Sequence, residues 1–355
     1  MNILDRYVMR SILGSVLMVA SVLLILGALF VFIDQQEDIG TGNYTALGAV
    51  WYTLLSLPQQ AFELLPITAL IGSLLGLGSL ARGSEITVIR ATGISIAHLA
   101  GMALLAGLVL VGLAVVLGEF LGPALQQTAR EQKAFSRLSN VSFGSHGGAW
   151  VRDGDLFLHV SGQSGETEFG GVQIFELSPQ HELVALATAA RGTAGPKGNW
   201  LLSNYAESRF SGDTVIKSNP SQRILKSNVT AGVLGLASQN PGQLTNRALL
   251  RLIRYYRANS LSDREYVFAF WSRIARTVAV AFTVLLAIPF VLGSLRTAGA
   301  GTRMLMGLVL GLGFFLLQRL IESGTVVFNL NPLLLAWMPT ALLALVVLVL
   351  LARVR

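Results

Sequence analysis

Cysteine is absent from this chain of 355 residues, and charged residues are scarce. Without cysteine the protein can form neither disulfide bonds nor thiolate metal sites, and its redox compartment stays undetermined. Asp, Glu, Lys and Arg make up only 13% of the residues, hydrophobic residues make up 53%, and the mean hydropathy is +0.62. This composition argues against an ordinary soluble protein and indicates a polytopic membrane protein.

Catalytic, metal-binding and nucleic-acid-binding motifs are also missing. The four histidines, His98, His146, His159 and His181, lack the spacing of metal ligands, so we assign none of them to a metal. We find no Walker phosphate loop, HExxH or GxSxG motif, and therefore expect neither an enzyme nor a chain that binds its own cofactor. The formal net charge is +7, but the basic residues flank apolar runs and form no basic soluble domain, which argues against a nucleic-acid partner.

Six apolar stretches are long enough to cross a bilayer, which takes about 20 helical residues. They run from Ser11 to Ile33, Trp51 to Ala81 (clearest from Leu64), about Ala91 or Ser95 to Gly118, about Phe268 to Leu295, about Met304 to Val327, and Pro332 to Leu351. Pro58 and Pro66 predict a kink in the second stretch, and Pro123 is expected to end the third helix. The first stretch is too long for the core of a signal peptide and is interpreted as a span.

Between the third and fourth spans the composition becomes that of a soluble domain. Short β-rich runs, separated by turn residues, cover Ala149 to Val151, Leu156 to Val160, Val172 to Leu177, Leu183 to Ala187, Trp200 to Asn204 and Ser208 to Phe210. They predict an antiparallel β domain, a sandwich or jelly roll, and the spacing from Thr245 to Asn259 predicts a helix after it. The expected divisions are residues 1–123 with three spans, 124–262 with the β domain and flanking helices, and 263–355 with three spans.

The distribution of arginine predicts how the chain is oriented in the membrane. The short segments on the side of the termini carry Arg6, Arg10, Arg82, Arg90, Arg296, Arg303, Arg353 and Arg355. The short loops on the other side carry Asp34, Glu37 and Asp38 and no Lys or Arg. By the positive-inside rule, the termini lie in the cytoplasm and the β domain lies outside it.

A charged island, RGSEITVIRATG from Arg82 to Gly93, lies between the second and third spans. Ser84 is expected to cap a helix over residues 84–92, and Gly93 to end it in the left-handed conformation. A helix of about eight residues is only about 12 Å long and cannot cross a bilayer.

Two interpretations of this short helix stay open. It either turns the chain around, or it couples the membrane helices to a soluble partner. In the second case Glu85 accepts hydrogen bonds from the partner, and Arg82 and Arg90 pair with its carboxylates, while Ile86 or Ile89 fills a groove.

Just beyond the third span, Arg130, Lys133 and Arg137 share one helix face. Such a stripe suits the phosphates of an anionic lipid headgroup, and a solvated basic face is the alternative. Arg319 and Glu322 lie in the outer part of the fifth span, where a charge is costly unless it is paired or faces water. They are either functional or an ordinary pair within one helix.

Several motifs in fixed order resemble the YjgP/YjgQ family of permeases. They are LDRYVMR at Leu4 to Arg10, FIDQ at Phe32 to Gln35, SEITVIRATG at Ser84 to Gly93, GEFLGP at Gly118 to Pro123, FWSRI at Phe270 to Ile274 and GSLRT at Gly293 to Thr297. The family contains two sister permeases; SEITVI occurs in both, whereas LDRY, FIDQ and GEFLGP favour one of them.

The resemblance implies a permease subunit of an ABC transporter that extracts lipopolysaccharide from the outer leaflet of the inner membrane. Its implied partners are the paralogous permease LptF, two copies of the ATPase LptB that hold ATP and Mg, the single-span protein LptC and the periplasmic bridge protein LptA. The β domain would be the family's periplasmic jelly roll.

The resemblance also assigns roles to single residues. Glu85 matches the acidic residue of a coupling helix, and Arg130 and Lys133 match positions that contact lipid A phosphates. The first and fifth spans, with Phe30, Phe314 and Arg319 as candidates, would line a lateral opening for acyl chains.

The chain departs from some relatives at positions where they carry lysines. It has Val31 late in the first span, Gln36, Glu37 and Asp38 after the FIDQ motif, and Gln59 in the second span. These headgroup contacts cannot be transferred, so more weight falls on Arg130, Lys133 and Arg137. The alternative from another class is a membrane-anchored assembly or adhesion scaffold whose outer β domain binds a partner.

Overall fold

A computed structural model describes most of the chain in two compact units. It covers residues 3–40, 43–137, 149–153, 155–163, 168–178, 180, 182–195, 199–211, 214–226, 241–259, 261–292, 299–324 and 331–353. Unit 1 comprises Met1–Gln35, Thr53–Gln126 and Val267–Arg355, and unit 2 comprises Gln36–Tyr52 and Gln127–Tyr266.

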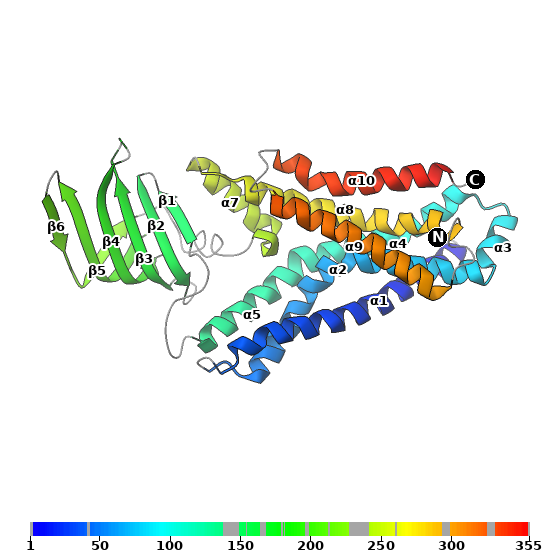
Figure 1. Cartoon of the computed structure of the whole chain (residues 1–355), viewed down its shortest axis with the longest axis horizontal. Helices are drawn as coiled ribbons and strands as arrows, with labels where there is room; N and C mark the ends of the chain where they lie inside the picture. The colour runs from blue at the N-terminus through cyan, green and yellow to red at the C-terminus, as the bar shows by residue number, and fades with distance from the viewer. Residues whose placement is uncertain are drawn as a thin grey trace. The chain divides into compact units, whose positions relative to one another are not determined.

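Unit 1 is built from long apolar helices (Figure 1). They are α1 (Ile3–Gln35), α2 (Ala46–Arg82, whose first turns belong to unit 2), α4 (Ile96–Val115), α8 (Arg264–Leu292), α9 (Ala300–Gly324) and α10 (Pro332–Arg353). Among the described residues, five helical stretches are long and apolar enough to cross a membrane, and the apolar part of α9, Leu305–Ile321, is shorter. The expectation of a multi-pass helical membrane protein is confirmed.

The third span continues beyond the point where Pro123 was expected to end it. A π-helical turn, η2 (Val116–Leu121), follows α4 and leads directly into α5 (Gly122–Arg137). Pro123 lies in the first turn of α5, where its missing N–H is tolerated, and the wider π turn takes up the change of hydrogen bonding. The basic stripe therefore belongs to a helix continuous with the third span.

Helices α1 and α2 cross with their backbones unusually close. A Cβ on Gly72 would lie 2.4 Å from Cα of Val16, and a Cβ on Gly76 would lie 2.8 Å from the carbonyl oxygen of Ser11. Small residues four apart on one helix face allow this approach. α2 is the most buried of the candidate spans, so the other helices of unit 1 are organised around it.

Both termini and the short helix α3 (Glu85–Ala91) lie at the same end of the unit 1 helices (Figure 1). A chain that crosses a layer an even number of times has this arrangement. The fold thus places Arg82, Arg90 and Arg353 at one end of the helices, as the charge pattern requires.

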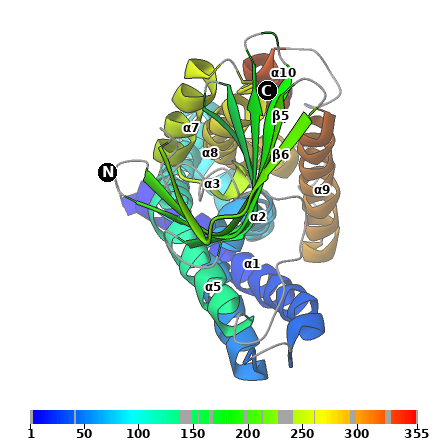
Figure 2. The same cartoon turned by 90° about the vertical axis from the view of Figure 1, so that its left-hand side faces the viewer.

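In unit 2, the expected β domain is an antiparallel sheet (Figures 1 and 2). Its strands are β1 (Ala149–Asp153), β2 (Leu156–Gln163), β3 (Glu168–Leu177), β4 (Leu183–Ala194), β5 (Asn199–Ser211), β6 (Thr214–Ser218) and β7 (Gln222–Lys226). β1 to β6 pair in chain order, and β7 also pairs with β5. The described strands thus form one antiparallel sheet in which β1 to β6 follow one another as a meander.

The two runs expected at Trp200 to Asn204 and Ser208 to Phe210 are one bent strand, β5. Asn204 has φ +55°, which shifts the alternation so that Trp200, Leu202 and Tyr205 are all buried. β7 pairs with the first half of β5 and β6 with the second half. Unit 2 also contains η1 (Gln36–Asp38), η4 (Pro241–Gln243) and α7 (Asn246–Ala258), the helix expected after the strands.

Candidate functional site

The short helix α3 is close to its predicted bounds, and Ser84 is its N-cap residue, as predicted. Ser84 adopts φ 60°, however, and its side chain makes no capping hydrogen bond. The left-handed turn at Ser84 reverses the chain directly after α2. Gly93 has φ +92° and ends the helix in the left-handed conformation, as predicted.

Glu85 is held by a residue that sequence reasoning missed. The hydroxyl of Tyr7 in α1 donates a hydrogen bond of 2.7 Å to Oε2 of Glu85. Tyr7 belongs to the LDRYVMR motif and Glu85 to the SEITVIRATG motif, so the fold brings two of the family-like motifs together. The sequence indicated only that both residues belong to family-like motifs. It gave no information that Tyr7 and Glu85 are hydrogen-bonded to each other.

The apolar residues of α3 divide into an inner and an outer set. Ile86 and Ile89 are only 3% and 8% exposed, and Ile86 packs into the main core of unit 1. Because both side chains are buried within their own chain, they anchor α3 to it. The expectation that Ile86 or Ile89 fills a groove of a partner was wrong. Val88, which is 63% exposed, faces outward with Arg82 and Arg90.

The basic residues Arg130 and Lys133 converge on one tyrosine. The guanidinium of Arg130 is half-buried and donates a hydrogen bond to the hydroxyl oxygen of Tyr52 in α2. The ammonium of Lys133 lies 5.2 Å from the ring centre of Tyr52 and 5.8 Å from that of Tyr44. The backbone of Arg137 ends α5, and its side chain lies outside the described residues.

Lys133 also has an acidic partner inside unit 2. Its Nζ atom lies 2.5 Å from Oδ2 of Asp38, and both side chains are 20% exposed. The described part of this site therefore holds two cations, one carboxylate and two aromatic rings.

The other lipid-contact candidates lie on α1 and α9 in unit 1. Phe30 is 66% exposed on α1, Phe314 is partly buried against the main core, and Arg319 is exposed on α9. The side chain of Glu322 lies outside the described residues, so its pairing with Arg319 stays a prediction. Phe315 of α9 packs with Val19 of α1 against α2.

A group of polar side chains is buried inside unit 1. Arg273 of α8 is 7% exposed and stacks on Phe62 of α2, 5.4 Å from the ring centre. Arg276 lies 5.9 Å from the same ring, and its Nε and Nη2 lie 2.8 Å from the side-chain amide of Gln318, whose oxygen accepts from both when it is turned toward the guanidinium. This contact ties α8 to α9. The FWSRI motif contains Arg273, but an apolar span gives no sign of which helix receives it.

Gln59 of α2 is also part of this interior. It is 4% exposed and donates from Nε2 to Oε1 of Glu63 at 3.0 Å.

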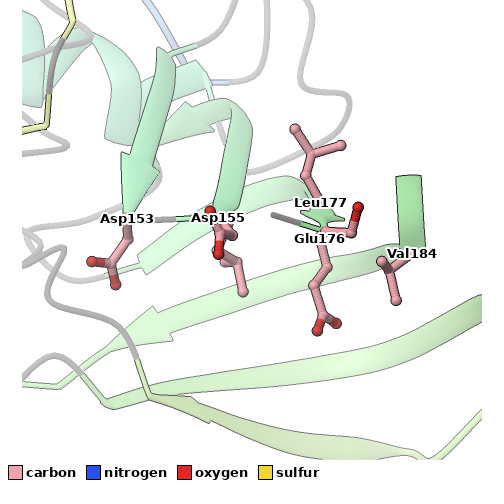
Figure 3. Close-up of a pocket in the computed structure, with 7 residues that line it drawn as sticks. Asp153, Asp155, Glu176, Leu177 and Val184 are labelled. Carbon is pink, nitrogen blue, oxygen red and sulfur yellow. The ribbon is translucent and has the colours of Figure 1, made fainter. Parts of the chain in front are cut away.

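The sheet of unit 2 carries an acidic hollow at the ends of its first strands (Figure 3). It is lined by Asp153, Asp155 and Glu176, together with Leu177 and Val184. Glu176 is paired with Arg209 at 2.9 Å. Among the described residues no three His, Cys, Asp or Glu side chains could hold a metal ion, so the hollow carries no candidate metal centre.

Comparison with known proteins decides the family. The model of a family described as lipopolysaccharide export system permease LptF/LptG matches residues 6–353. The chain belongs to this family.

Two relatives show which sister permease the chain resembles. The lipopolysaccharide export system permease protein LptG of Escherichia coli strain K12 is 31% identical over 354 residues, 99% of this chain and 98% of the relative. The LptG protein of Haemophilus influenzae strain KW20 is 28% identical over 355 residues, 100% of this chain and 99% of the relative. The motifs LDRY, FIDQ and GEFLGP predicted an LptG-type permease, and this prediction is confirmed.

Proposed function

We propose that this LptG-type chain is the transmembrane subunit of an ABC transporter that extracts lipopolysaccharide from the outer leaflet of the inner membrane. The lipid would pass to a periplasmic bridge for delivery to the outer membrane. The family match over residues 6–353 carries the proposal, because both relatives that share this full length are export permeases by name.

The partners follow from the same proposal. LptF would be the second permease, two LptB subunits would hydrolyse ATP, LptC would join at the lateral gate, and LptA would form the bridge. We place the termini and α3 in the cytoplasm and the β domain in the periplasm. Arg82 ends α2, Arg90 lies on α3 and Arg353 ends α10. These helix ends lie together in Figure 1, which supports this orientation.

We assign the coupling of ATP hydrolysis to α3. A force on Val88, Arg82 or Arg90 would reach the core of unit 1 through the buried Ile86, and α1 through the hydrogen bond between Tyr7 and Glu85. α1 is one of the two helices expected to line the lateral opening. Movement of α3 would therefore change the opening without requiring a nucleotide site in this chain.

The basic site of α5 is assigned to the headgroup. A guanidinium that is positioned by Tyr52 loses little freedom when it binds a phosphate, and its forked donors suit phosphate oxygens. Acyl chains would lie along α1 and α9, where Phe30 is exposed.

Substitution of Glu85 tests the proposed function. The assay uses vesicles that contain the complete transporter. Glu85→Ala is expected to reduce ATP-dependent release of lipopolysaccharide at least about tenfold. A tenfold effect corresponds to the loss of about 1.4 kcal/mol from the contacts of Glu85. Tyr7→Phe removes only the internal hydrogen bond, and release is expected to fall about two- to tenfold. Thr87→Ala, an exposed change on the same helix, is the matched control.

The same assay separates the transporter from the scaffold alternative. A scaffold would retain its partner when Glu85 is replaced and would show no ATP-dependent lipid release in the unmodified complex. Unchanged release by the Glu85→Ala complex would disprove the coupling role of α3.

A further inference from the structure

Lys133 is engaged within its own chain before any lipid arrives. Its ammonium contacts the carboxylate of Asp38 at 2.5 Å and faces the rings of Tyr44 and Tyr52. A carboxylate and aromatic faces are the partners that an ammonium ion prefers in a partly desolvated site. Lys133 therefore already has the kind of partner that a lipid phosphate would supply.

The position of Asp38 is set by a turn and not by a free loop end. Asp38 ends η1, and two residues later Gly40, with φ +91°, donates from its backbone N–H to the carbonyl of Tyr44 at 2.9 Å. Thr45 then caps α2 by accepting a hydrogen bond from the backbone N–H of Gly48. The hydrogen bond between Gly40 and Tyr44 links the segment that carries Asp38 to Tyr44, and the side chains of both Asp38 and Tyr44 contact Lys133.

The turn that carries Asp38 is acidic. After the FIDQ motif it contains Glu37 and Asp38 and no Lys or Arg. A phosphate that approaches Lys133 thus meets the negative charge of Asp38. Like charges that are brought together in a partly buried site repel strongly.

We infer that Asp38 is an internal counter-ion which competes with the anionic headgroup, so that a lipid phosphate reaches Lys133 only by displacing the Asp38 carboxylate. The inference rests on the proposed binding of a phosphate-bearing headgroup at Arg130 and Lys133. It makes Arg130 the first contact of the phosphate and Lys133 the second. It also makes the bound lipid easier to release, because Asp38 returns to Lys133 as the phosphate leaves.

A double-mutant cycle in the complete transporter tests the inference. The measurement is equilibrium binding of fluorescent lipopolysaccharide to the detergent-purified complex without ATP. Asp38→Asn is expected to tighten binding about tenfold, which corresponds to about 1.4 kcal/mol. The same change in a Lys133→Gln background is expected to alter binding less than about twofold, since the competed ammonium is gone.

Glu37→Gln is the matched control. It removes the same charge from the neighbouring, exposed position of the same turn, and is expected to change the affinity less than about threefold. Equal tightening by Glu37→Gln and Asp38→Asn would show a general effect of charge and overturn the inference. Weaker binding by Asp38→Asn would also overturn it, because Asp38 would then act only to position Lys133. The melting temperature of each complex checks that the variants are folded.

Two further arms separate this inference from its premises. If Arg130→Gln and Lys133→Gln leave lipid binding unchanged, the headgroup assignment fails and the inference fails with it. If they weaken binding while Asp38→Asn does not tighten it, only the counter-ion role fails. An excess of inorganic phosphate is expected to displace little of the bound fluorescent lipopolysaccharide. If inorganic phosphate displaced it as well as unlabelled lipopolysaccharide does at the same phosphate concentration, free phosphate would be the ligand and the lipid assignment would be overturned.

Discussion

Glu207 in the β domain illustrates how the fold accommodates a nearly buried charge. Its side chain is 7% exposed and is contacted by Arg209, Arg223 and Tyr205. Burial is the largest influence and raises the pKa of Glu207, but the hydrogen bond from Arg209 and the charge of Arg223 outweigh it and lower the pKa below its ordinary value. Burial raises the pKa of Tyr205 to about 12, so its hydroxyl stays protonated and donates to the carboxylate.

Because the folded pKa of Glu207 is lowered, its contribution to stability is present above the unfolded pKa and is lost as the pH falls through the folded pKa. Glu207→Gln is expected to cost about 1.5–3 kcal/mol at pH 7 and to cost less at pH values below about 4. Hydrogen exchange of β5 in the full-length chain at both pH values measures this. Glu168→Gln, at an exposed position of β3, is the control; an equal cost at both pH values would contradict the prediction.

For single residues, the sequence identified candidate functional side chains but not the side chains that contact them. Glu85, Arg130 and Lys133 could be named because each stands beside an apolar run in a recognisable pattern. Tyr7 and Asp38 could not be paired with them, because residues far apart in the chain meet only once the helices have packed.

The close crossing of α1 and α2 depends on small residues at the point of contact. Gly72 and Gly76 place one backbone against the other, and the hydroxyl of Ser11 donates to the carbonyl of Gly76 at 3.2 Å. Apolar periodicity predicted both helices but not this contact, because a glycine within a span looks the same whether it faces lipid or another backbone.

Gly72→Ala is expected to destabilise the helix pair by about 1–3 kcal/mol, because the added methyl group has no space beside Val16. Gly101→Ala in α4 is the control, since a Cβ there meets nothing within 4 Å. The melting temperature of the detergent-purified full chain distinguishes the two variants. Equal melting temperatures would show that the crossing tolerates a wider separation.

For the whole molecule, the contacts between α1, α2 and α9 bear on the proposed entry path of acyl chains. Val19 of α1 and Phe315 of α9 belong to one small cluster with Ile67 and Ile71 of α2. If acyl chains enter between α1 and α9, these two helices must separate during part of the cycle. The lack of natural cysteine makes this testable with engineered thiols alone.

A reducible thiol crosslinker between Val19→Cys and Phe315→Cys is expected to abolish ATP-dependent release of lipopolysaccharide, and reductant is expected to restore it. The matched pair Phe268→Cys and Ala336→Cys joins α8 and α10, which also share an apolar cluster, and is expected to leave release largely intact. Full release by the crosslinked α1 and α9 pair would exclude this entry path.

The sequence by itself determined the class of the protein, most of its spans, the short helix between two of them and the existence of an antiparallel β domain. These features follow from composition and local periodicity, which depend on residues close together in the chain. The tertiary structure alone decided that the described strands form a meander, that Ile86 faces inward, and that Lys133 is paired with Asp38. Each of these depends on which distant segments pack together, and local patterns contain no information about that choice.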